Sequence, residues 1–259
     1  MKLRYKITVG ILIFVFLFFS AVAVSISYTA DCPPAAEAAS GSTMKAVVYR
    51  CYGGPDVLEY ADIPMPVPAE HEVLVKVHAA GVNPLDWHFM RGSPFVMRLM
   101  TGIGAPKDAA LGRDFAGVVE AVGENVTRFK AGDRVYGGAN GAFAEYLVRR
   151  ETGSIALMPA NVSFEEAAAV PVAAITALQA LRDNGQLQAG QKVLINGASG
   201  GVGTYAVQIA NSKGAEVHGV NSTRNVELVL GLGADRVFDY KMENYTESKE
   251  RYDLILDLV

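Results

Sequence analysis

The spacing of hydrophobic residues changes along the chain, and its first region is almost continuously apolar. Lys2, Arg4 and Lys6 precede a run from Ile7 to Tyr28 that carries no charge. As a helix, such a run is long enough to cross a hydrocarbon core, which takes about 20 residues. The positive charges before the run predict that the N-terminus lies inside the membrane-bounded compartment. We therefore expect residues 1–28 to form a single-pass N-terminal membrane anchor.

A cleaved signal peptide is the competing interpretation of the same residues. Its apolar segment would run from Ile7 to Ser20, with cleavage after the small residues Ala21-Val22-Ala23. The uninterrupted length of the run favours a retained anchor. The side of the membrane on which the globular part lies stays open, because the charge rule places it outside whereas nicotinamide cofactors are cytoplasmic.

Residues 29–43 are small, contain prolines and lack apolar periodicity, which is typical of a linker. Cys32 lies in this linker, and Cys51 is the chain's other cysteine. In an oxidising compartment the two would pair as a disulfide, and otherwise they are unrelated free thiols. The sequence leaves both alternatives open.

From residue 44 to 162 the apolar positions are arranged as short strands. Residues 72–79 alternate apolar and polar side chains, the pattern of a half-buried strand, and glycine-containing turns separate the neighbouring runs. The spacing predicts a compact, barrel-like all-β unit. Its expected strands cover residues 45–50, 57–60, 72–79, 116–122, 134–136 and 143–148.

The period changes again at Ser163, where Ser163-Phe-Glu-Glu166 predicts a capping box at the start of a helix. After it, strands and helices alternate, which is typical of a parallel sheet in an α/β domain. The expected elements are residues 193–196, 202–212, 217–220, 224–232 and 236–239, followed by a buried strand within 252–259. A doubly wound dinucleotide-binding sheet usually has six strands, so we expect residues 163–259 to be an incomplete, C-terminally truncated domain.

The most informative motif joins the first of these strands to the helix after it. Residues 198–203 fit the pattern G-x-G-x-x-G with Ala198 in first place. Gly200 lets the backbone approach a pyrophosphate, and Gly203 lets helix and strand pack closely. The strand before and the helix after supply the context that the motif needs. The candidate cofactor-binding residues here are Ala198, Ser199, Gly200, Gly201, Val202 and Gly203.

The end of the second strand indicates which dinucleotide binds. An NAD-preferring site places a carboxylate there for the ribose 2′-hydroxyl, whereas this chain has Asn221 followed by Ser222, Thr223 and Arg224. Hydroxyls and a guanidinium suit a 2′-phosphate, because charge-assisted hydrogen bonds to phosphate are strong. The pattern favours NADPH over NADH. The alternative is that Ser222 caps a helix and Arg224 is merely solvated.

Composition excludes some functions. The chain has 259 residues, 51% of them hydrophobic, and a formal net charge of −4, which suits one or two globular domains. Basic residues are neither in excess nor clustered, so nothing indicates nucleic-acid binding. Two cysteines and four histidines leave few metal ligands.

With an all-β part first and the nucleotide motif near residue 198, the chain resembles the medium-chain dehydrogenase/reductase superfamily. Within it, the chain is most similar to the zinc-independent quinone oxidoreductase branch that includes zeta-crystallin. The resemblance covers residues 44–259. It is carried by the stretches at residues 79–86, 111–123, 132–136, 141–146 and 198–203.

The resemblance implies a GroES-like substrate domain over residues 44–162 and a Rossmann domain over residues 163–259. It implies hydride transfer from NADPH to a quinone, enone or aldehyde. Zinc-dependent members carry a catalytic cysteine where this chain has Pro84 and a metal-ligating stretch where it has Arg113. Neither side chain ligates zinc, so we expect no metal.

The resemblance also assigns candidate catalytic residues to the segment lining the substrate cleft, namely Asn83, Asp86 and His88. His88 stands where relatives carry a tyrosine and would donate a proton or hydrogen bond, the alternative being a helical histidine without a role. Asp86 would hold the loop. Thr176 would approach the nicotinamide half and Tyr240 the adenosine phosphate, although both also suit purely structural roles.

A different class of function stays open. The chain could be a membrane-tethered, NADPH-binding adaptor or regulatory protein without turnover. Among enzymes, the alternative is an enoyl reductase acting on lipid-derived enones. The expected partners are a small carbonyl or quinone substrate and the membrane, with a homodimer as the candidate assembly, and the sequence does not identify the substrate.

Overall fold

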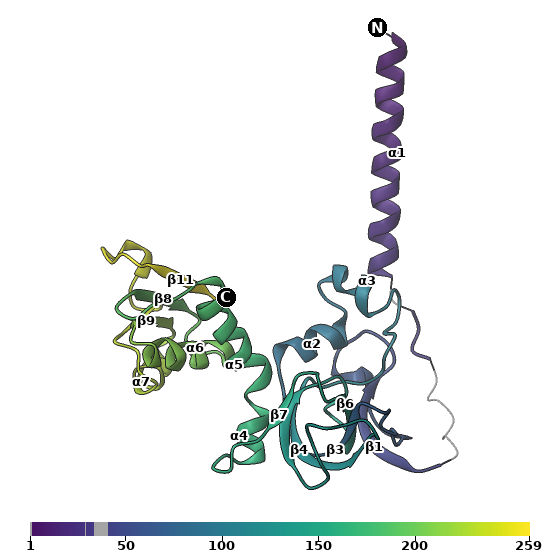
Figure 1. Ribbon diagram of the computed structural model, residues 1–259. Coiled ribbons are helices and arrows are strands. Elements are labelled where there is room, and N and C mark those ends of the chain that lie inside the picture. Colours follow the sequence, from purple (N-terminus) through teal and green to yellow (C-terminus); the bar gives the residue numbers. More distant parts are fainter. Residues whose placement is uncertain (1, 29, 34–40) are drawn as a thin grey trace. The chain divides into compact units, whose positions relative to one another are not determined.

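The computed structural model describes residues 2–28, 30–33 and 41–259, and it describes side chains of the first helix for residues 11–24. The chain divides into two compact units, Met1–Ala168 and Ala169–Val259. Figure 1 labels the elements of both units in chain order.

The first helix, α1 (Lys2–Ser27), covers the segment expected to be a membrane anchor. In the described part of the chain, no helix combines the length and the hydropathy that a membrane crossing needs. The expectations of a transmembrane helix and of a single-pass membrane location are therefore wrong, and the expected membrane partner has no support.

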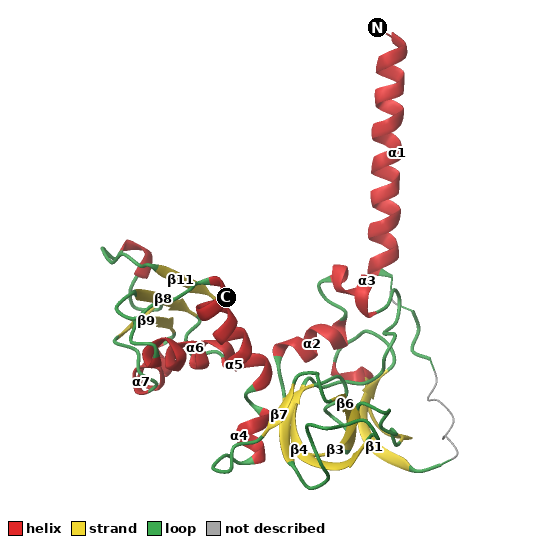
Figure 2. Ribbon diagram, in the orientation of Figure 1, coloured by secondary structure: helices red, strands yellow, loops and turns green. Residues whose placement is uncertain are grey.

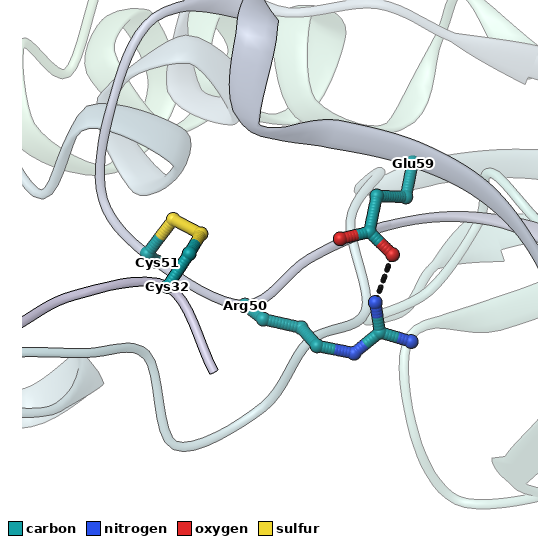
Figure 3. The surroundings of a disulfide bond; sticks show 4 residues. All are labelled: Cys32, Arg50, Cys51 and Glu59. Carbon is teal, nitrogen blue, oxygen red and sulfur yellow. Dashed lines mark hydrogen bonds and ion pairs between the residues drawn. A yellow bond between two sulfur atoms is a disulfide. The ribbon is translucent and has the colours of Figure 1, made fainter. Parts of the chain in front are cut away.

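The segment after α1 is attached to the first unit by three described contacts. The Arg98 guanidinium donates to the Tyr28 carbonyl at 2.7 Å, and the Ala30 N–H donates to the Gly104 carbonyl at 2.9 Å. Cys32 and Cys51 form a disulfide with their Cα atoms 4.9 Å apart. Figure 3 shows this bond near the ion pair of Arg50 and Glu59. Of the two alternatives for the cysteines, the structure therefore has the paired one.

The first unit is built on antiparallel sheets, as the alternating pattern predicts. A five-stranded sheet has the order β6-β3-β4-β5-β7, and β1 pairs with β2 in a second sheet. Figure 2 shows these strongly curved strands in yellow, joined by long loops. The strands are β1 (Thr43–Tyr49), β2 (Leu58–Pro64), β3 (Glu72–Gly81), β4 (Asp114–Val122), β5 (Arg134–Gly138), β6 (Tyr146–Arg150) and β7 (Ile155–Leu157).

The inward-facing residues of this sheet form the core of the first unit. Val73, Val75 and Phe115 are fully buried there together with Val135. Three helices complete the unit: α2 (Pro84–Arg91), α3 (Arg98–Thr101) and α4 (Phe164–Ala168). The capping box expected before α4 is present, since the Ser163 N–H donates to the Glu166 carboxylate at 2.8 Å and the Glu166 N–H donates to the Ser163 hydroxyl at 3.2 Å.

The second unit is the expected α/β arrangement. Four parallel strands have the order β10-β9-β8-β11. They are β8 (Lys192–Asn196), β9 (Glu216–Asn221), β10 (Arg236–Asp239) and β11 (Leu254–Asp257), and the helices are α5 (Pro171–Leu178), α6 (Gly201–Ser212) and α7 (Val226–Gly231).

Continuous apolar runs explain the inner strands of this sheet. Val193 and Ile195 of β8 are fully buried, and Val207 of α6 packs in the same core. The last strand differs from its prediction as a buried strand. Ile255 is 62% exposed, because β11 lies at the edge of the sheet and pairs only with β8 among the described strands.

Candidate functional site

The glycine motif forms a tight turn between β8 and α6. Gly197 has a φ of +81°, a left-handed conformation that favours glycine, and Gly200 is the N-cap of α6. A Cβ atom on Gly203 would lie 2.2 Å from the Gly197 carbonyl oxygen. That distance excludes any side chain at residue 203. The third glycine of the motif therefore has the packing role that the sequence predicts.

The N-terminus of α6 is open on the side of this turn. The Gly200 N-cap supplies no side-chain hydrogen bond, and a Cβ on Gly201 would meet nothing within 4 Å. The first N–H groups of a helix have no partner inside the helix, so they attract an anion. A hollow of about 470 Å³ adjoins the turn. It is lined by Asn196, Gly197, Ser199, Val220, Asn221, Ser222, Arg224, Asn225, Tyr240, Tyr245 and Val259.

In the first unit, the candidate catalytic residues lie at the N-terminus of α2. The Asp86 carboxylate accepts from the Asn83 backbone N–H at 2.8 Å, and the Asn83 amide donates to the Asp114 carboxylate at 3.1 Å. Asp86 is 3% exposed, and one of its carboxylate oxygens contacts no donor among the described residues. Burial raises the pKa of Asp86, while the Asn83 hydrogen bond and the nearby Arg113 charge lower it less.

His88 lies two residues after Asp86 in α2 and is half-buried. Its Nδ1 is 2.7 Å from the Ser93 carbonyl oxygen, and its ring meets Trp87 edge-on at 4.5 Å. Since a carbonyl only accepts, we assign the proton to Nδ1 in the neutral ring. The Nε2 atom is then the one that can exchange a hydrogen bond with another molecule.

Comparison with known proteins places this geometry in a family. Residues 69–162 match the alcohol dehydrogenase GroES-like domain. The chain is 40% identical over 235 residues to the chloroplast envelope quinone oxidoreductase homolog of Arabidopsis thaliana, covering 84% of this chain and 68% of that protein. The human quinone oxidoreductase is 36% identical over 226 residues, covering 83% of this chain and 66% of that protein.

The chain belongs to the quinone oxidoreductase branch of the medium-chain dehydrogenase/reductase superfamily. Members of this superfamily are NAD(P)-dependent oxidoreductases. A solved structure, the Escherichia coli quinone oxidoreductase complexed with NADPH, is 31% identical with a TM-score of 0.69, covering 78% of this chain and 60% of that one. The chain spans about two thirds of the length of the curated relatives it matches.

Only some of the predicted cofactor-binding residues line the hollow beside α6. Ser199, Ser222, Arg224 and Tyr240 line it. Ala198 is buried in the turn before α6, Gly201 and Val202 begin the helix, and Gly203 is buried in its first turn. Thr223 is exposed outside the lining.

Thr176 does not lie at this hollow. It is on α5, where its hydroxyl donates to the Val172 carbonyl of the preceding turn at 2.6 Å. Because the hydroxyl already donates its proton within the helix, it can only accept a hydrogen bond from a ligand. Its proposed role near the nicotinamide stays a prediction.

Sequence reasoning missed several residues that line the hollow, among them Asn225 and Tyr245. The Asn225 amide donates to the Ser199 hydroxyl at 2.9 Å and so fixes the glycine turn to the segment after β9. Asn225 directly follows the Asn221–Arg224 segment, which was the available signal. Tyr245 carried no such signal, because it comes from a loop beyond β10.

The first unit also contains a polar hollow that the sequence did not indicate. Its walls include Tyr49 at the end of β1 and Arg113 just before β4. The Arg113 guanidinium stacks 3.8 Å from the centre of the Phe89 ring of α2. The expected absence of a metal stays a prediction, to be tested by metal analysis of the purified protein.

Proposed function

We propose that this protein is an NADPH-dependent oxidoreductase that transfers a hydride to a quinone, enone or aldehyde without zinc. The observation that carries the proposal is the open N-terminus of α6, which begins at glycines. It adjoins a hollow lined by Arg224, whose guanidinium has no partner among the described residues. Family membership supports the reaction class.

The residues around α6 fit the phosphates of a dinucleotide. A Cβ on Gly201 would meet nothing within 4 Å, so the start of α6 is uncrowded there, and the N–H groups of its first turn can take a pyrophosphate. Arg224 is exposed, and no acceptor among the described residues bonds its guanidinium, so it is available to a 2′-phosphate together with Ser222. Tyr240 would contact the adenosine end.

Bound NADPH would supply the hydride, and the protein's own groups would stabilise negative charge that develops on the acceptor oxygen. His88 is the candidate donor of a proton or hydrogen bond, through Nε2 once protonated. Asn83 is a second candidate, whereas Asp86 positions the start of α2. In this assignment Asp86 is a positioning residue, since its carboxylate is bonded to the backbone of the same turn.

The test is NADPH oxidation by the intact protein, as the cell makes it, with a panel of quinones, enones and aldehydes. Replacing His88 with Phe should lower kcat about 100-fold, because a positioned acid contributes at least that much. His71→Phe is the matched control, since the His71 side chain is 60% exposed and lies beside Glu151, away from α2.

Each result decides a separate claim. Unchanged turnover in His88→Phe would remove His88 from the mechanism. NADPH binding without oxidation of any acceptor would overturn the reductase proposal and favour a cofactor-binding regulatory protein.

A further inference from the structure

The guanidinium of Arg113 has no hydrogen-bond acceptor among the described residues. It lies over the Phe89 ring, and the half-buried position of Arg113 limits its access to solvent. An arginine carries five N–H donors in a planar fork, and those donors match the two oxygens of a carboxylate. Two other arginines of this unit differ: Arg98 donates to three backbone carbonyls, and Arg50 pairs with Glu59.

Tyr49 supplies a second free donor on the same hollow. Its side chain is 97% buried, and no described group bonds its hydroxyl, yet the residue lines the hollow beside Arg113. Burial, with smaller effects of Tyr52 and Asp108, raises the pKa of Tyr49 to about 12. The hydroxyl therefore keeps its proton at neutral pH and can donate it to an oxygen.

The other charged groups of the hollow do not cancel the positive charge of Arg113. The Asp108 carboxylate already accepts from the Ala110 N–H and from the Asn140 amide. Lys107 is exposed, and nothing among the described residues bonds its ammonium group. The hollow has a volume of about 170 Å³ and is lined by Tyr49, Phe89, Met100, Thr101, Lys107, Asp108, Ala110, Arg113 and Asn140.

We propose that this hollow binds the carboxylate of an organic acid, with Arg113 and Tyr49 as the donors. The apolar body of the ligand would lie against Phe89 and Met100. The inference also names a substrate class: the hydride acceptor is a quinone or enone that carries a carboxylate. This part rests on the proposed function. Because both donors belong to the first unit, recognition of the acid needs no bound cofactor.

The first experiment measures binding without turnover. Benzoate is titrated into the intact protein by calorimetry, with benzyl alcohol as the uncharged analogue. We expect benzoate to bind in preference to the alcohol. Arg113→Gln should weaken benzoate binding about 10- to 100-fold, because a charge-assisted bidentate contact is lost, and Tyr49→Phe about 5-fold.

Arg91→Gln is the matched control for Arg113→Gln. Arg91 also stacks on an aromatic residue of α2, 4.9 Å from the centre of the Trp87 ring, but it does not line the hollow. The Arg91→Gln variant should bind benzoate as tightly as the parent protein does. If Arg113→Gln fails to fold, Arg113→Lys and Tyr49→Phe still test the site, since Lys keeps the charge and loses the fork.

A second experiment separates this inference from the proposed reductase. A carboxylated naphthoquinone and the uncharged parent quinone are compared as acceptors, and Arg113→Gln should lower kcat/KM only for the carboxylated one, about 10-fold or more. Benzoate binding that depends on Arg113, with neither quinone reduced, would keep the acid site and overturn the reductase. Equal use of both quinones in parent and variant, without benzoate binding, would overturn the acid site alone.

Discussion

The helices α2 and α6 both begin directly after a strand, yet their N-termini are completed in opposite ways. At α2, the Asp86 carboxylate accepts the Asn83 N–H, and the Asn83 amide reaches Asp114 on β4. At α6, the Gly200 cap offers no side chain, and a Cβ built on Gly201 would meet no atom within 4 Å.

The difference separates a structural helix start from a binding one. A terminus whose groups are bonded by its own side chains holds the chain in place and has little left to offer a ligand. A terminus of bare glycine keeps its N–H groups and its positive dipole end available. Residues at α2 should therefore affect stability and positioning, and residues at α6 should affect cofactor affinity.

Filling the turn before α6 should have the largest effect. Gly203→Ala places a methyl group 2.2 Å from the Gly197 carbonyl oxygen, so we expect a loss of about 3 kcal/mol in the free energy of unfolding. Urea unfolding measures it. Gly201→Ala is the control that sharpens the comparison: its methyl group meets no protein atom, so stability should hold while NADPH affinity falls about 10-fold. Equal stability of the two variants would contradict the tight turn.

Removing the cation beside α6 should have the next largest effect. Arg224→Ala should raise the Kd for NADPH about 10- to 100-fold and leave the Kd for NADH within about 2-fold, because only NADPH carries the 2′-phosphate. Fluorescence titration with each nucleotide gives both constants. Equal losses for the two nucleotides would show that Arg224 does not read the 2′-phosphate.

The smallest expected effect is the pH dependence of stability that Asp86 confers at the N-terminus of α2. Burial raises the pKa of Asp86 above the ordinary 3.8, so the folded state favours the protonated acid. That contribution is full below pH 3.8 and is lost as the pH rises through the raised pKa. The neutral Asp86→Asn variant should therefore gain stability relative to the parent over that window, as thermal unfolding at several pH values would show.

Asp133→Asn is the control of opposite sign. Hydrogen bonds from the backbone and side chain of Lys130 lower the pKa of Asp133, so its contribution is present above pH 3.8 and lost as the pH falls through the lowered pKa. The parent should therefore be more stable than Asp133→Asn near neutral pH, and this difference in stability should disappear at acidic pH. The same direction in both variants would mean that Asp86 is not desolvated in the folded state.

Local signals made the glycine turn and the capping box at Ser163 predictable, because each depends on residues within a few positions of one another. The contact between Asn83 and Asp114 joins residues 31 apart, and it exists only because β3 and β4 are neighbours in the sheet. The pair of Tyr49 and Arg113 likewise depends on the bridge between Val48 of β1 and Ala110, in the segment before β4. The apolar run at the N-terminus carried a strong local signal for a membrane anchor, and that prediction was wrong.

The disulfide of Cys32 and Cys51 closes a covalent ring that contains all of β1. A protease that cut the chain once inside this ring would leave both fragments joined through sulfur. On a non-reducing gel the cut protein would run close to its intact mass, and only reduction would release the N-terminal fragment with α1. Electrophoresis of this protein with and without reductant therefore distinguishes a nicked chain from an intact one.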